Sequence, residues 1–194
     1  MSRRIVPAKP RKKIEIDHLA ISVVKAIQPS ALSKAERFEI ERFFDCYLEE
    51  ITGVKTDYRA LDDGIYGFTD SDRMECVISC ELAEDATSEY FCRSTMAHEV
   101  GHAIMHVMDY RLKKALLRSI HRKDHQLRVY REKEIKIYKN PEWQAWRFAG
   151  SILMPERPFR RLHRQGHSDN EMSEIFGVNP AFIRSRKKAL NLRA

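Results

Sequence analysis

The sequence predicts an α+β fold that is rich in helices, with one small antiparallel sheet and a pair of helices at the C-terminal end. Three observations lead to this prediction. Most apolar residues recur at helical spacing, and one stretch between residues 65 and 80 changes to a period of two. The 194 residues also include only 7 Gly and 7 Pro, which is typical of helix-rich proteins. A chain of this length can bury a core of its own.

Two helices are predicted in the N-terminal third. The first runs from about His18 to Ile27, with Asp17 as its N-cap. The second begins at Ser33, because Ser33 and Glu36 match a capping box, and its apolar stripe stops before Gly53. Both helices are expected to serve as scaffold.

A β-hairpin is predicted next, and a helix follows it. The apolar runs 65–68 and 74–80 flank a turn at residues 70–73, as in a hairpin. After a polar connection, Ser94 or Thr95 is expected to cap a helix that continues through residue 107.

The stretch 109–139 is rich in long basic side chains and is predicted to be a helical insert. Such an insert could contact nucleic acid or an acidic partner, and a solvated helical hairpin explains it equally well. Asn140 and Pro141 then open a helix that ends at Pro155. Two short helices, 169–176 and 180–190, resemble a helix-turn-helix pair, and the second carries several cations: Arg184, Arg186, Lys187 and Lys188.

Composition limits the class of protein. The net charge is +7, which favours acidic partners. Residues 1–16 are basic with two prolines near the start and are expected to form a disordered arm. No apolar stretch is long enough for a membrane span or follows the N-terminus as in a signal peptide, so we expect a cytoplasmic protein without membrane partners. The four cysteines form no Cys-x-x-Cys pair, so buried thiols are expected rather than a cysteine zinc site.

The segment His98-Glu99-Val100-Gly101-His102 predicts a metal site. Two histidines four residues apart on a helix project from one face and can bind one zinc ion. Glu99 lies next to the first histidine and can act as general base toward a water on that metal. Gly101 would allow a neighbouring backbone to approach, and His106 is expected in the core or behind the ligands rather than on the metal.

A zinc site of this kind needs a third protein ligand. Glu142 is the best candidate, because it opens a helix whose dipole favours the ionised carboxylate. An ordinary carboxylate in the first turn of a helix explains Glu142 at least as well when the sequence is considered alone.

Two blocks of the sequence resemble the ImmA/IrrE family of bacterial and phage metallopeptidases. Residues 93–106 read Arg-Ser-Thr-Met-Ala-His-Glu-Val-Gly-His-Ala-Ile-Met-His, like the family's Ala-His-Glu-x-Gly-His run with its trailing histidine. Residues 142–155 resemble a second block of the family, which begins with a glutamate three positions before an alanine and ends in Leu-Met-Pro. Residues 172–178 and the following helix resemble the family's C-terminal pair, and the looser resemblance spans about residues 17 to 192.

The resemblance implies a zincin-like metallopeptidase domain over residues 17–156, with the insert 109–139, followed by helix-turn-helix-like helices over 157–194. It also implies a Zn²⁺ ion bound by three side chains, with a fourth as general base: His98, His102 and Glu142 as ligands and Glu99 as the base. The substrate would be a regulatory protein, a DNA-binding repressor or an antitoxin. One departure from the family is Trp146, where Asn or Asp usually orients a ligand histidine. The long basic insert is the other.

An alternative function remains open at this point. The same surface could serve a non-proteolytic anti-repressor or toxin–antitoxin component that binds a partner protein or DNA. Glu99 favours chemistry, because a structural zinc site needs no base. The side chain that would stabilise an oxyanion is not identified, and four residues are candidates: Tyr66, Tyr90, His163 and His167.

Overall fold

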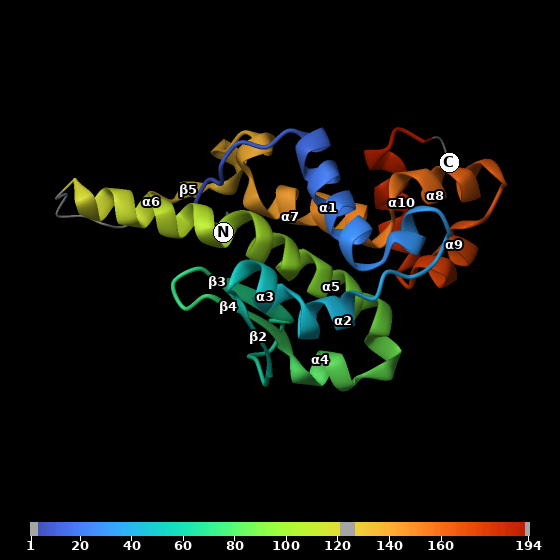
Figure 1. Ribbon diagram of the computed structural model, residues 1–194, viewed down its shortest axis with the longest axis horizontal. Coiled ribbons are helices and arrows are strands. Elements are labelled where there is room, and N and C mark those ends of the chain that lie inside the picture. The colour runs from blue at the N-terminus through green and yellow to red at the C-terminus, as the bar shows by residue number, and fades with distance from the viewer. Residues whose placement is uncertain (1–3, 121–126, 193–194) are drawn as a thin grey trace.

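Two antiparallel helices, α5 (Glu89–His102) and α7 (Pro141–Leu153), form the centre of the fold. The computed structural model describes residues 4–120 and 127–192. Helix α1 (Lys13–Ile27) packs on α7, and the sheet packs on the other side of α5 (Figure 1). Ten of the fourteen residues of α5 are buried, so this helix is surrounded by the core. The predicted helix-rich α+β fold is confirmed.

The sheet has three strands in the order β2-β4-β3. The predicted hairpin is present as β3 (Gly67–Asp70) and β4 (Glu75–Ser79), which pair antiparallel. Strand β2 (Lys55–Arg59) adds to the other edge of β4 in parallel. Strand β2 is not predicted from the sequence, because Lys-Thr-Asp-Tyr-Arg shows neither an apolar run nor a clean alternation. Strand β4 is covered on both faces, so its expected alternation fails: Cys76, Val77 and Ile78 are all fully buried.

The remaining elements surround this centre. The short helices before the sheet and after β4 are η1 (Pro29–Leu32), α2 (Ile40–Cys46), α3 (Leu48–Thr52), α4 (Cys80–Glu84) and η2 (Ala86–Ser88). After α5 come the π-helical turn η3 (Ala103–Val107), α6 (Met108–Ser119), β5 (Tyr130–Arg131), η4 (Glu132–Glu134) and η5 (Ile137–Lys139). The C-terminal elements are α8 (Glu156–Arg164), α9 (Asp169–Phe176) and α10 (Pro180–Ala189). None of the helices in the described part of the chain has the length and apolar character needed to cross a bilayer.

Three predicted helix starts are wrong. Helix α1 begins at Lys13, so Asp17 is not its cap. Residues 33–39 are not helical, because the Glu36 carboxylate accepts hydrogen bonds from Ser30 and Gln28 instead of completing a capping box. Helix α5 begins at Glu89, five residues before the expected cap at 94 or 95. The carboxylates of Asp17 and Glu36 make other contacts, and Ser94 and Thr95 lie inside α5.

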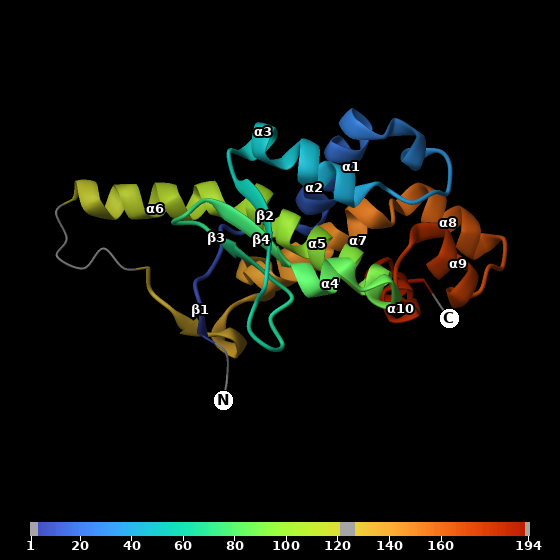
Figure 2. The same ribbon diagram turned by 90° about the horizontal axis from the view of Figure 1, so that it is seen from below.

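The N-terminal segment is ordered from residue 4, which contradicts the expected disordered arm over residues 1–16. Strand β1 (Arg4–Ile5) pairs antiparallel with β5, and the two strands lie side by side in Figure 2. Beyond β1, the backbone N–H groups of Ala8 and Arg11 donate to the carbonyls of Lys139 and Tyr138. Ala8 is 3% exposed. The segment is held by these backbone bonds, which its basic composition does not reveal.

The basic insert forms a projecting helix rather than a helical hairpin. Helix α6 extends away from the body of the protein and has no buried residue (Figures 1 and 2). Over the described residues 127–139, the chain returns through β5 and the short turns η4 and η5 and forms no second α-helix. Residues 121–126 of this basic stretch, which include the cations Arg122 and Lys123, lie outside the described residues.

The C-terminal helices are tied to α1 and α7 by a buried polar network. Arg147 on α7 forms an ion pair with Asp17 on α1, and Ser151 donates to the same carboxylate at 2.6 Å. Arg186 on α10 is 3% exposed and donates to Ser151 and to the Met154 carbonyl. Arg186, one of the four cations that suggested a DNA contact, therefore points into the core.

Two further cations of α10 are also used within the protein. Arg184 and Lys187 both approach the Asp169 carboxylate of α9, at 3.7 and 2.6 Å. Three of the four cations thus have partners inside the C-terminal pair or the core. This arrangement argues against α10 as a helix that reads DNA.

Candidate metal centre

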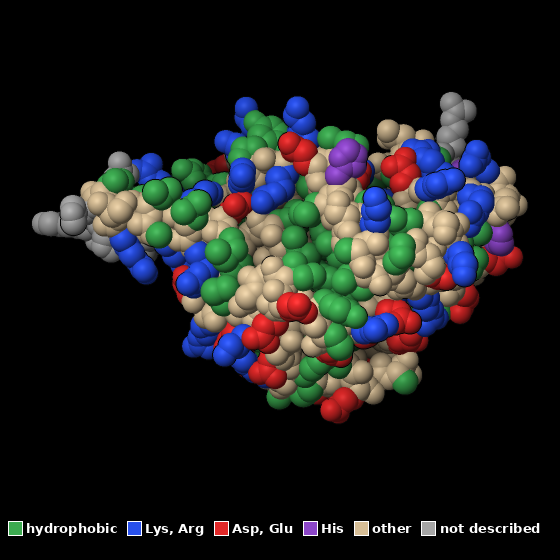
Figure 3. Space-filling model, viewed as in Figure 1, with side chains coloured by type: hydrophobic (Ala, Val, Ile, Leu, Met, Phe, Trp, Pro, Cys, Tyr) green, Lys and Arg blue, Asp and Glu red, His purple; other side chains and the backbone are tan. Residues whose placement is uncertain are grey.

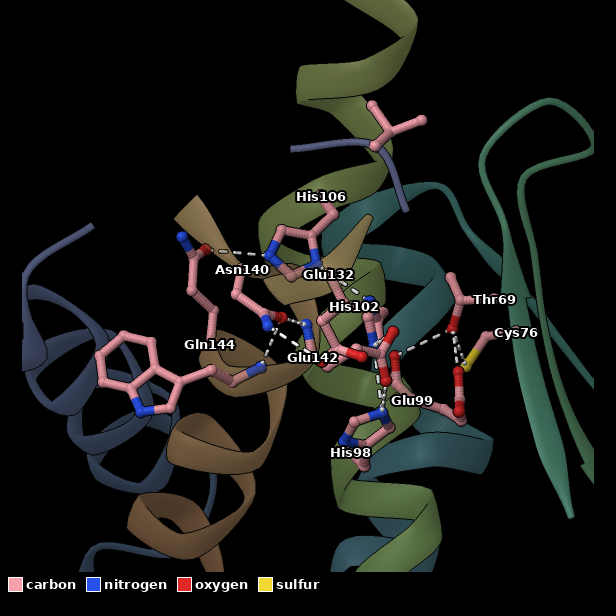
Figure 4. A network of polar contacts seen from close by, with 12 residues as sticks. Thr69, Cys76, His98, Glu99, His102, His106, Glu132, Asn140, Glu142 and Gln144 are labelled. Atoms are coloured by element: carbon pink, nitrogen blue, oxygen red, sulfur yellow. Dashed lines mark hydrogen bonds and ion pairs between the residues drawn. The ribbon is translucent and has the colours of Figure 1, made fainter. Parts of the chain in front are cut away.

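Helices α5 and α7 bring two histidines and a glutamate to one point. His98 Nε2 and His102 Nε2 are 3.0 Å apart, and the Glu142 carboxylate oxygens lie 3.5 and 3.6 Å from them (Figure 4). A tetrahedral zinc ion with ligands at about 2.0 to 2.1 Å spaces its ligand atoms about 3.3 Å apart. The donor atoms and their spacing therefore fit a zinc ion, and the three residues form a group that could hold a metal.

The start of α7 places Glu142. The Asn140 side chain accepts hydrogen bonds from the backbone N–H groups of Glu142 and Trp143, and Pro141 occupies the first helical position. This confirms the predicted cap and fixes the first turn, where the helix dipole favours a carboxylate.

Gly101 allows α7 to approach α5. A Cβ atom at this position would lie 3.2 Å from the Ala145 Cα atom and 3.2 Å from the Phe148 ring. These contacts are tighter than side chains normally make, and one of them is with backbone. The expected packing role of Gly101 is confirmed, and it explains how ligands on two helices meet.

Glu99 is buried, with an exposed fraction of 8%, and lies beneath the edge strand β3. The Thr69 hydroxyl donates to Glu99 Oε2 at 2.7 Å. A Cβ atom on Gly67 of the same strand would come within 3.1 Å of Glu99 Cγ. Strand β3 therefore holds the Glu99 side chain in place. Thr69 lies 30 residues from Glu99 along the chain, so no local sequence pattern links the two residues.

His106 is buried behind His102, as expected from the sequence. Its Nδ1 atom lies 3.0 Å from His102 Nδ1, and its Nε2 atom lies 3.0 Å from the Gln144 Oε1 atom. The π-helical turn η3 takes more than 3.6 residues, so it rotates His106 less than an α-helical turn would. Burial lowers the pKa of His106 to about 4, so its ring is neutral.

Trp146 occupies the space beside the other histidine. Its ring centroid is 4.3 Å from that of His98 and 5.7 Å from that of Phe182. The buried His98 Nδ1 atom has no hydrogen-bond partner among the described residues. The polar contact that the family usually supplies at position 146 is absent here. The two histidines thus differ: His102 has a partner behind it, and His98 has an aromatic ring.

A cavity of about 860 Å³ opens beside the metal group. Its lining includes His102, Glu142, Thr69, Tyr110, Arg111 and Lys114. The side chains considered as oxyanion stabilisers do not line it. Tyr90 donates to Glu174 and accepts from Arg37, and Tyr66 packs on Phe91. Tyr110 does line the cavity, and its hydroxyl donates to the Val6 carbonyl at 2.9 Å.

The helix-rich α+β fold and the His-His-Glu group agree with the metallopeptidase-type protein that the sequence predicts. The model of the IrrE N-terminal-like domain, a peptidase family, matches residues 82–188, and the protein belongs to this family. The resemblance to the ImmA/IrrE family is thereby confirmed. The match runs across residue 156, so the division predicted there stays a prediction.

Comparison with curated proteins gives no significant match. Among solved structures, a Mycobacterium tuberculosis transcriptional regulator is similar, with a TM-score of 0.55 at 14% sequence identity. The alignment covers 88% of this chain and 54% of that chain. The chain thus spans about half the length of that regulator, and the likeness shows the fold alone.

Proposed function

We propose that the protein is a zinc-dependent endopeptidase, with His98, His102 and Glu142 as zinc ligands. The spacing of the three ligand atoms supports this proposal most strongly. A zinc ion in such a site supplies a Lewis acid that polarises a peptide carbonyl and lowers the pKa of water. Membership of a peptidase family supports the same conclusion.

Glu99 is the proposed general base. Its carboxylate would accept a proton from the attacking water and return it to the amine of the leaving peptide. The hydrogen bond from Thr69 to Oε2 holds the carboxylate in one orientation, so proton transfer would need little rearrangement. Tyr110 and the cations of α6 line the adjoining cavity, where substrate would lie.

The proposed substrate is one regulatory protein, a DNA-binding repressor or an antitoxin, that is recognised in the cytoplasm through surfaces outside the metal centre. Helix α6 offers such a surface, because it projects from the body and is apolar and basic along its exposed length (Figure 3). Its exposed apolar residues lie four apart: Met108, Leu112, Leu116 and Ile120. Docking there would raise the local concentration of one scissile loop at the active site.

The substitution Glu99→Gln separates catalysis from binding. The variant should keep its zinc and its fold, and should lose peptidase activity by a factor of about 100 or more. Thr69→Val is a useful companion, because it keeps the shape of the side chain and removes the hydroxyl that donates to the Glu99 carboxylate, so it should lower activity less. A biological effect that survives Glu99→Gln would favour the alternative, a non-proteolytic anti-repressor or toxin–antitoxin component that acts by binding.

A further inference from the structure

The N-terminal segment between β1 and α1 reaches the metal centre from behind. The Arg11 guanidinium donates to Gln144 Oε1 at 3.3 Å, to the Met105 carbonyl at 2.8 Å and to the Asp109 carboxylate at 2.8 Å. The Lys9 carbonyl accepts from Gln144 Nε2 at 2.9 Å. Residues 9 and 11 therefore contact both ends of one buried amide.

These contacts determine which way the Gln144 amide points. Its Nε2 atom faces two backbone carbonyls, those of Lys9 and Tyr138, at 2.9 and 2.8 Å. Only the NH₂ group can donate to two carbonyls, so the oxygen must face Arg11 and His106. Gln144 is fully buried, and no rotation of the amide would satisfy the same four partners.

The orientation of Gln144 in turn fixes the protons on two histidines. Since Gln144 Oε1 can only accept, the His106 Nε2 atom must carry the proton. A second proton on His106 would place a charge on a ring that is only 2% exposed, so the His106 Nδ1 atom is the acceptor and His102 Nδ1 donates to it across 3.0 Å. The His102 Nε2 atom is left with its lone pair directed at the metal group (Figure 4).

We propose that the N-terminal segment, through Arg11 and the Lys9 carbonyl, positions the zinc ligand His102 by way of Gln144 and His106. This inference rests on the metal site of the proposed function. Arg11 also binds the Met105 carbonyl within the π-helical turn, so the same side chain stabilises the turn that carries His106. Hydrogen-bonding groups behind a metal ligand set its ring orientation and basicity.

Arg11→Met tests the proposal, because it keeps the length of the side chain and removes its hydrogen bonds. The zinc affinity, measured by competition with a chromophoric chelator, should fall about tenfold, as is typical for groups behind a ligand. Lys113→Met is the matched control: Lys113 holds the same segment through the Pro7 carbonyl at 3.0 Å but has no bond to Gln144. Its zinc affinity should stay close to that of the wild type. Arg11→Lys should recover part of the loss.

Nitrogen–proton NMR spectra of the histidine rings give a second readout that does not depend on zinc binding. The zinc-free wild type should show His106 protonated at Nε2, and Arg11→Met should show a mixture of tautomers at His106. A wild-type His106 protonated at Nδ1, or equal losses of zinc affinity in Arg11→Met and Lys113→Met, would overturn the proposal. A wild type that binds no zinc would instead contradict the proposed function. In that case the tautomer of His106 would still test the hydrogen bonds that link Arg11, Gln144 and His106.

Discussion

Replacing Asp17 with alanine should strongly destabilise the protein. The Asp17 and Arg147 side chains are 14% and 8% exposed, and the carboxylate also accepts from Ser151. Removing one partner of a buried ion pair costs about 3 to 5 kcal/mol, because the other charge stays buried without compensation. Here the cation left behind is Arg147, with the buried Arg186 close to the same network.

For a chain of this size, 1 kcal/mol corresponds to about 2 to 4 °C in Tm, so Asp17→Ala should lower Tm by about 6 to 20 °C. Glu156→Ala is the control, because the Glu156–Arg160 pair is 45% and 39% exposed. An exposed pair four residues apart on a helix contributes about 0.3 to 0.5 kcal/mol. Thermal and urea unfolding would measure both variants. An Asp17→Ala variant as stable as Glu156→Ala would refute the role assigned to the buried pair.

The effect should depend on pH. Burial alone would raise the pKa of Asp17, but hydrogen bonds from Arg147 and Ser151 and the charge of Arg147 hold it below its usual value of 3.8. A carboxyl group with a lowered pKa in the folded state contributes stability above its unfolded pKa. That contribution is lost as the pH falls through the folded value. The difference in free energy of unfolding between wild type and Asp17→Ala should therefore be constant at neutral pH and shrink below about pH 4.

Three further predictions concern the site and the projecting helix. Gly67→Ala should lower peptidase activity with zinc content unchanged, because the added Cβ would lie 3.1 Å from Glu99 Cγ; unchanged activity in a peptidase assay would show that β3 does not hold this side chain. Trp146→Asn should raise zinc affinity up to about tenfold by giving His98 Nδ1 a partner, and chelator competition that shows no gain would contradict this. Partner binding through α6 should weaken as the salt concentration rises, because salt screens charges beyond about 10 Å at 0.1 M. Reversing the charges of Lys113, Lys114 and Arg118 should weaken it further. A partner affinity that changes neither in a salt titration nor on charge reversal would assign α6 to another role.

The parts of the site that lie on local motifs could be predicted from the sequence. His98 and His102 share one turn of α5, and the cap of α7 consists of adjacent residues, Asn140 and Pro141. The hairpin was also predictable, because its turn separates two short apolar runs. Each of these features depends on residues only a few positions apart.

The contacts behind the ligands could not be predicted, because they join distant parts of the chain. Gln144 lies 38 residues from His106 and 133 from Arg11 along the sequence, and no local pattern links them. A basic segment with prolines reads as disordered until its backbone partners are known. The cap at Asp17 was wrong for a similar reason, since the carboxylate pairs with Arg147, which is 130 residues away.

The zinc content of Glu142→Gln tests the proposed metal centre most directly. The wild-type protein should contain one zinc ion per chain by elemental analysis after dialysis, since the donor atoms fit one tetrahedral ion. Glu142→Gln removes the charged ligand and should lose most of the zinc. Glu156→Gln changes another carboxylate in the first turn of a helix and should keep it. A Glu142→Gln variant that retains a full zinc ion with wild-type affinity would contradict the account.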